Sequence, residues 1–181
     1  MLIARQKKKE NIAEYLLYMW QVEDIIRACG GDMNLIRQRI IDGYQGLTDE
    51  TRREMTDWYE NLCEMMRIEG VMEKGHLQIN KNVIIELTDL HQRLLKSTRE
   101  PFYGAAFFKA LPYIVELRAR SGNAEAGEIE TCFNALYGIL MLRLQKKEVS
   151  PDTEKAVHAI SQFLALLSEK YKQERAGELE L

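Results

Sequence analysis

The sequence predicts an all-α protein folded as an up-and-down bundle of about seven helices. Apolar residues recur every three or four positions along most of the 181-residue chain, which is the spacing that gathers them on one face of a helix. Only 3 prolines and 11 glycines occur, so few residues interrupt long helices. The segments between the expected helices are short, and short connections favour antiparallel neighbours.

Length and composition indicate one domain. The chain is 46% apolar and 29% charged, which is typical of a globular protein and too apolar for disorder. A chain of this length buries a substantial core and needs no metal or disulfide to stabilise it. We therefore expect residues 1–181 to form a single helical domain, with frayed tails at 1–6 and 175–181.

The first helix is predicted over about residues 6–29, where the glycine pair at positions 30–31 stops it. Apolar residues at helical spacing form its buried face: Ile12, Tyr15, Met19, Val22, Ile26 and Cys29. Leu16 and Trp20, four residues apart, form a second apolar strip beside this face. Because this strip is apolar, we expect either another helix of the same chain or another molecule to cover it. The second alternative stays open because tryptophan is enriched at interface hot spots. Glu23 follows near the helix end, where we expect burial to end.

Two further helices are predicted between residues 32 and 75. Asp32 is suited to cap a short helix that ends near Tyr44, because its side chain can accept a hydrogen bond from a free backbone N–H. Thr48 is suited to cap a longer helix in the same way. Gly75 breaks the helical pattern.

The segment after Gly75 is interpreted as a loop that places Leu77 and Ile79 in the core. Asn80 or Asn82 is expected to cap a fourth helix that ends near position 97. His76 is expected on the surface.

A fifth helix is predicted from Pro101, which suits a first helical turn, to about Gly122. Pro112 lies inside this helix and should kink or split it at about residues 110–111, because proline has no backbone N–H to donate. Asn123 is expected to cap the sixth helix.

The last helix is predicted to begin at Ser150 and Pro151, an N-cap residue followed by proline at the first helical position. Its apolar stripe continues to Tyr171, and the polar residues beyond position 174 belong to the expected tail.

The charge balance argues against a nucleic-acid partner. The formal net charge is -3, from 25 basic and 28 acidic residues. Nucleic-acid binding generally needs a basic surface that neutralises several phosphates. The compact basic run, Arg5 with residues 7–9, is interpreted as part of the solvated tail.

Cysteine usage and hydropathy predict a cytoplasmic protein. Cys29, Cys63 and Cys132 are far apart and lack a CxxC spacing, so we expect reduced thiols that pack as small core residues. The amino-terminal segment lacks the order of charges of a signal peptide. No apolar run approaches the roughly 18 residues of a membrane span, so no membrane partner is expected.

No catalytic constellation is recognisable in the sequence. Glu154 and His158 are four residues apart, but one such pair supplies too few ligands for a metal ion. The chain contains no Gly-x-Ser-x-Gly, no P-loop and no Gly-x-Gly-x-x-Gly. We predict no catalytic residue, no metal and no cofactor, and a non-enzymatic protein is favoured.

His91 lies within the apolar stripe of the fourth helix. A buried imidazole needs a hydrogen-bond partner, because burying it without one costs a few kcal/mol. One interpretation is a neutral core histidine bonded to a carbonyl or a carboxylate. The other is a ligand-binding or proton-transferring histidine in a pocket lined by the aromatic residues near positions 103–108.

The segment YLLYMWQVEDIIRA resembles the amino-terminal signature of a family of bacteroidete proteins that is known only as a domain of unknown function. The resemblance covers most of the chain and implies an all-helical cytoplasmic protein. It carries no catalytic or binding residues. The residues that distinguish the signature are Tyr15, Tyr18, Trp20, Gln21, Glu23 and Asp24.

Two functional hypotheses remain. The first is a protein that acts through protein–protein contacts or self-association, for example as a homodimer. The second is a small-molecule-binding protein or enzyme with an inter-helix pocket near His91. A pocket that holds His91 and a carboxylate would favour the second hypothesis, and a solid core at that position would remove it.

Overall fold

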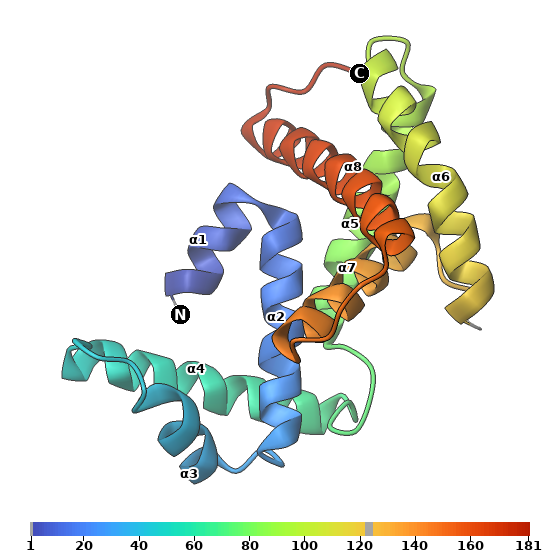
Figure 1. The fold of residues 1–181 in the computed structure, drawn as a ribbon. Coiled ribbons are helices and arrows are strands. Elements are labelled where there is room, and N and C mark those ends of the chain that lie inside the picture. The colour runs from blue at the N-terminus through green and yellow to red at the C-terminus, as the bar shows by residue number, and fades with distance from the viewer. Residues whose placement is uncertain (1, 122–124) are drawn as a thin grey trace. The chain divides into compact units, whose positions relative to one another are not determined.

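The computed structural model describes residues 2–121 and 125–181, and within these residues it contains helices and no strand (Figure 1). The predicted all-α helical bundle is confirmed. The described part of the chain forms eight α-helices and one π-helical turn: α1 (Leu2–Glu10), α2 (Ile12–Ala28), α3 (Met33–Ile36), η1 (Arg37–Ile41), α4 (Asp49–Ile68), α5 (Gln78–Lys96), α6 (Pro101–Ser121), α7 (Glu128–Leu144) and α8 (Pro151–Ala176).

Asn11 divides the first expected helix into α1 and α2. Its side-chain Oδ1 accepts hydrogen bonds from the backbone N–H groups of Ala13 (3.0 Å) and Glu14 (3.1 Å). Asparagine favours such caps over helix interiors, because its side chain competes for backbone donors. Residues 2–6, expected as a frayed tail, lie in α1 instead.

The chain divides into two compact units. The first unit comprises residues 1–8 and 15–82, and the second comprises residues 9–14 and 83–181. The helices α1, α2 and α5 contribute residues to both units. The single domain expected from the composition stays a prediction.

In the first unit, α3, η1 and α4 pack together. Both predicted caps are confirmed: Asp32 accepts a hydrogen bond from the backbone N–H of Asn34 (2.8 Å), and Thr48 accepts one from Thr51 (3.1 Å). Beyond α4, Leu77 is buried as expected. The prediction for Ile79 is wrong, since that side chain is 39% exposed.

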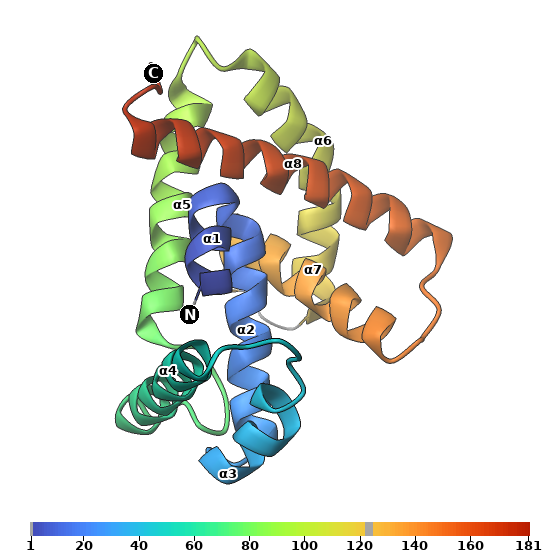
Figure 2. The same cartoon turned by 90° about the vertical axis from the view of Figure 1, so that its left-hand side faces the viewer.

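In the second unit, α6, α7 and α8 pack against one another (Figures 1 and 2). Pro112 lies inside a continuous α6, so the helix is not split there. Figure 2 shows that α6 bends along its length, as expected for an interior proline that cannot donate a backbone hydrogen bond. Ser150 caps α8 as predicted. Asn123, the expected cap of the sixth helix, lies outside the described residues, and α7 begins at Glu128.

All three cysteines are free and buried, in keeping with their prediction as core residues. Among the described residues, no helix combines the length and hydropathy needed to cross a membrane.

Candidate functional site

Glu23 is fully buried, so the expectation that burial ends at this residue is wrong. Its Oε1 atom accepts hydrogen bonds from the backbone N–H of Leu77 (2.9 Å) and from the side-chain amide of Asn80 (2.7 Å). Its Oε2 atom lies 2.5 Å from Nδ1 of His76. A buried carboxylate is stabilised only when hydrogen-bond donors surround it in this way.

The same carboxylate lies at the amino terminus of α5. The predicted caps Asn80 and Asn82 are both wrong, because α5 already begins at Gln78. The backbone N–H of Gln78 donates to Oε2 of Glu69 (2.6 Å), next to the bond from Leu77 to Glu23. Two carboxylates from elsewhere in the chain therefore accept hydrogen bonds from the N–H groups of Leu77 and Gln78 at the start of this helix, where the helix dipole favours negative charge.

Trp20 and Arg27 complete this group of side chains. The indole ring of Trp20 stacks on the imidazole of His76, with centroids 4.1 Å apart and planes inclined by 12°. Arg27 donates hydrogen bonds to the backbone carbonyls of Val71 (3.3 Å) and Gly75. We call Trp20, Glu23, Arg27, His76 and Asn80 the Glu23 cluster. Its bonds fix the loop before α5 and the first turn of that helix.

Leu16 and Trp20, the predicted contact strip, are 0% and 3% exposed. Of the two alternatives, the structure favours cover by the chain itself, and for Trp20 the cover includes the His76 ring. These two residues leave no exposed strip for another molecule.

His91 is 3% exposed and lies among aromatic side chains. Its Nδ1 is 2.6 Å from the hydroxyl oxygen of Tyr103, and its ring contacts the rings of Phe107 and Phe163 at centroid distances of 4.6 and 5.5 Å. Burial lowers the pKa of His91, against an opposing effect of Glu128. The environment is that of a neutral core histidine whose partner is a hydroxyl group, rather than the carbonyl or carboxylate that was expected.

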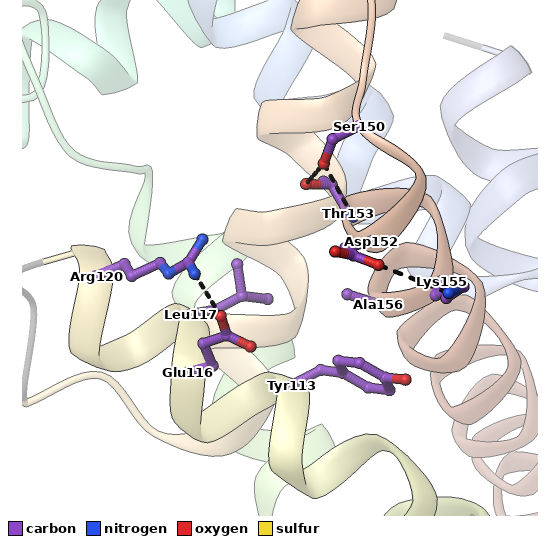
Figure 3. A pocket seen from close by; sticks show the side chains of 9 residues that line it. All are labelled: Tyr113, Glu116, Leu117, Arg120, Ser150, Asp152, Thr153, Lys155 and Ala156. Carbon is purple, nitrogen blue, oxygen red and sulfur yellow. Dashed lines mark hydrogen bonds and ion pairs between the residues drawn. The ribbon is translucent and has the colours of Figure 1, made fainter.

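The surface hollow shown in Figure 3 lies elsewhere in the same unit and does not include His91. Its volume is about 460 Å³, and it lies between α6 and the start of α8. The side chains that line it are Tyr113, Glu116, Leu117, Arg120, Ser150, Asp152, Thr153, Lys155 and Ala156.

The charged residues of this hollow already pair with one another. Glu116 lies 2.5 Å from Arg120, and Asp152 lies 3.6 Å from Lys155. All four side chains are at least 55% exposed. Ligand sites are usually apolar clefts with a few converging polar groups, so this open, charge-balanced surface does not have the character of a ligand site. The pocket expected beside His91 stays a prediction without support from this geometry.

A different feature of α6 stands out. Phe102, Phe108 and Val115 are 84%, 64% and 54% exposed. From Ala105 to Ala119 the exposed apolar residues follow one another at intervals of three and four positions and therefore share one side of the helix, with Phe102 at its edge one turn earlier. We call this surface the α6 face; its members are Phe102, Ala105, Phe108, Pro112, Val115 and Ala119.

The opposite side of α6 is equally apolar and forms part of the core. Tyr103, Ala110 and Ile114 are all 0% exposed, and Phe107 is 5% exposed. The sequence interpretation treated the aromatic residues of this segment as the wall of one pocket and so missed the division into two faces. The sequence did contain this information, because two separate rows of apolar residues, each spaced by three or four positions, run through residues 102–119.

The described residues contain no group of three or more histidine, cysteine, aspartate or glutamate side chains placed to hold a metal ion. Fold and surface together define an all-α protein that carries an exposed apolar helix face.

The chain belongs to the family described as Domain of unknown function (DUF4924), which matches residues 1–178. The resemblance to a family known only as a domain of unknown function is thereby confirmed. No curated protein and no solved structure matches the chain. Trp20 and Glu23, two of the residues that distinguish the family signature, both lie in the Glu23 cluster.

Proposed function

We propose that this protein acts through protein–protein contacts and that the α6 face is its contact surface. The observation that carries the proposal is the exposure of Phe108 and Val115 on one side of a single helix, with Phe102 exposed at the edge of that side. Isolated exposed apolar residues are common on proteins, but a continuous row with two aromatic members is typical of an interaction surface.

The size of the α6 face supports the proposal. Given about 200 Å² for a phenylalanine side chain, Phe102 and Phe108 together expose roughly 300 Å² of apolar surface. At about 25 cal/mol per Å², covering these two side chains alone provides roughly 7 kcal/mol of gross driving force, before the costs of association. Aromatic residues are enriched at interface centres for this reason.

The buried contacts of α6 come mainly from the side opposite the α6 face. The side chains of Tyr103 and Ile114 on the opposite side of α6 already supply the fully buried contacts of this helix. A row of apolar residues that the chain leaves mostly exposed is consistent with selection for contact with another molecule.

Catalysis and ligand binding have weaker support. His91 lies in a solid aromatic environment, and the hollow beside α6 is polar and balanced in charge. Neither place combines a cavity with a titratable group that is free to act, which is the usual mark of an active site.

The cytoplasm of a bacterium, and of a bacteroidete in particular, is the proposed cellular setting. The free, buried thiols suit a reducing compartment. The bacteroidete origin is what the sequence resemblance implies.

Site-specific photo-crosslinking tests the proposed contact surface. A photoreactive phenylalanine analogue at position 108 is expected to form covalent adducts of defined mass when the protein is irradiated in the cells that express it. The matched control places the same analogue at Ile85 of α5, which is 61% exposed but lies outside the α6 face. Mass spectrometry then identifies each adduct. Position 108 forming no more adducts than position 85 would contradict the proposal.

A further inference from the structure

We infer that the occupant of the α6 face is a second copy of this chain, with the two α6 helices paired antiparallel about a twofold axis. The inference rests on the proposed function and names its partner. It follows from the spacing, the charges and the sizes of the side chains on α6. In a twofold dimer the same surface serves both copies, so the face must be complementary to itself.

The spacing of the α6 face is that of a helix-pairing seam. From Ala105 onward, apolar exposed residues alternate at intervals of three and four positions: Ala105, Phe108, Pro112, Val115 and Ala119. This is the heptad spacing with which two helices pack side by side. A core-facing helix needs only one such stripe, and the buried side of α6 already provides it.

Two charged residues on the edge of this seam set the direction of pairing. Lys109 and Glu116 are exposed, seven residues apart, and therefore lie on the same side of α6. They are equally far from the middle of the Pro112–Tyr113 bond, about 5 Å along the helix axis in each direction. An antiparallel pair centred there brings Lys109 of each copy opposite Glu116 of the other. In a parallel twofold pair the two copies of this edge lie on opposite sides of the seam, so Lys109 of one copy would not meet Glu116 of the other.

The present partners of these two residues are compatible with that arrangement. Within the described residues Lys109 makes no ion pair. Glu116 of a second copy would therefore be its first ion-pair partner. Glu116 lies 2.5 Å from Arg120, and a carboxylate has room for a second cationic partner.

Large and small side chains alternate in the same register. Phe108 of one copy falls between Val115 and Ala119 of the other, since these two positions are equally far from the point opposite Phe108. Ala105 of one copy lies within one residue of the level of Ala119 of the other, where two small side chains allow close approach. This is the knob-and-hole relation that antiparallel helices require.

The area suits a dimer of modest affinity. A biological interface generally removes at least about 1,000 Å² in total, and at about 200 Å² per phenylalanine side chain the two copies of Phe108 supply roughly 250 Å² of it.

Sedimentation of the full chain tests the inference. The wild type is expected to show a reversible monomer–dimer equilibrium within roughly 1–100 μM. Lys109→Glu alone and Glu116→Lys alone are each expected to raise the dissociation constant about tenfold or more, because each places like charges together twice. The double variant Lys109→Glu/Glu116→Lys exchanges both signs and is expected to return the constant to within about threefold of the wild type. Failure of the double variant to recover dimerisation would overturn the antiparallel register.

Phe108→Glu is expected to abolish the dimer, and the matched control Ile85→Glu should leave it unchanged, with circular dichroism confirming that both variants are folded. A wild type that stays monomeric throughout the range, or a dimer that survives Phe108→Glu, overturns the inference. If the crosslinks from position 108 then lead to a different protein, the proposed function stands without the homodimer. Flotation of the wild type, but not of Phe108→Glu, with phosphatidylglycerol vesicles would overturn both.

Discussion

Glu23 and Asp24 are adjacent carboxylates on α2, and both lie near Arg27, but their environments differ. The Glu23 side chain is 1% exposed and 3.9 Å from Arg27, whereas that of Asp24 is 47% exposed and 2.7 Å away. The shorter ion pair, between Arg27 and Asp24, is the more exposed to solvent, and exposed pairs typically contribute less than about 1 kcal/mol to stability. Glu23, in contrast, accepts bonds from a backbone N–H and from a buried amide.

We expect Glu23→Ala to lower the free energy of unfolding by about 3 kcal/mol, because it leaves buried donors without an acceptor. Asp24→Ala, its matched control on the same helix, is expected to lower it by less than about 1 kcal/mol. Urea unfolding of the two variants measures the difference. Equal effects would show that the Glu23 cluster does not hold the loop before α5.

His91 makes stability depend on pH. Burial lowers its pKa in the folded state below the value of 6.5 for the unfolded chain, so the unfolded state binds more protons between these two pKa values. The contribution of neutral His91 to the free energy of unfolding is complete above pH 6.5. It is lost as the pH falls from 6.5 towards the lower pKa of His91 in the folded state.

The free energy of unfolding should therefore fall less between about pH 7.5 and about pH 5 in His91→Gln than in the wild type, because glutamine does not titrate. The exposed His158 of α8 provides the control, and His158→Gln should follow the wild-type profile. Urea titrations at several pH values give these profiles. A wild-type slope in His91→Gln would mean that another group dominates this window.

At the level of helices, capping makes a local contribution that can be tested singly. The hydroxyl oxygen of Ser150 accepts a hydrogen bond from the backbone N–H of Thr153 at 3.3 Å, at the start of the longest described helix. Ser150→Ala is expected to lower the free energy of unfolding by about 1 kcal/mol. Ser150→Asp should keep most of the stabilisation that the cap provides, because aspartate also caps well. Chemical denaturation measures both. An equal loss in both variants would assign the effect to something other than the cap.

Three caps formed by neighbouring residues were predicted from the sequence, although the local cap at Asn11 was missed, and the cap formed by distant residues was not predictable. Asp32, Thr48 and Ser150 each bond to a backbone N–H two or three residues ahead, so the pattern is visible locally. At the start of α5 the backbone N–H of Gln78 donates to Glu69 and that of the preceding Leu77 to Glu23, which lies more than fifty residues earlier in the chain. Only tertiary structure brings these two segments together. For the same reason the sequence placed Glu23 at the edge of burial.

The helix α6 shows a second limit of sequence interpretation. Hydropathy identifies apolar positions, but it does not reveal which of two apolar stripes the fold covers. Phe107 and Phe108 are consecutive and chemically identical, yet they are 5% and 64% exposed. The helix and its interior proline were predictable from the sequence, while the α6 face became recognisable only from the burial of its neighbours.

The two compact units are joined by continuous helices. Residues 12–14 of α2 belong to the second unit and the rest to the first, while α5 passes from the first unit to the second after Asn82. Ending either helix at the boundary would leave backbone groups unpaired, which is unfavourable because helix formation is cooperative.

We therefore expect calorimetry to show one unfolding transition in which the van't Hoff and calorimetric enthalpies agree. Glu23→Ala changes the first unit and Ser150→Ala the second, and both should lower the same midpoint temperature. Two separate transitions, each shifted by only one of the variants, would show that the units unfold independently.

The three buried thiols have a practical consequence. Cys29 and Cys63 belong to the first unit and Cys132 to the second. Burial raises the pKa of Cys132 to about 12, so this thiol stays protonated and unreactive until the surrounding helices open. Alkylation with a thiol-specific reagent, followed by peptide mapping, therefore measures how often each unit of the wild-type chain opens locally, without any engineered label.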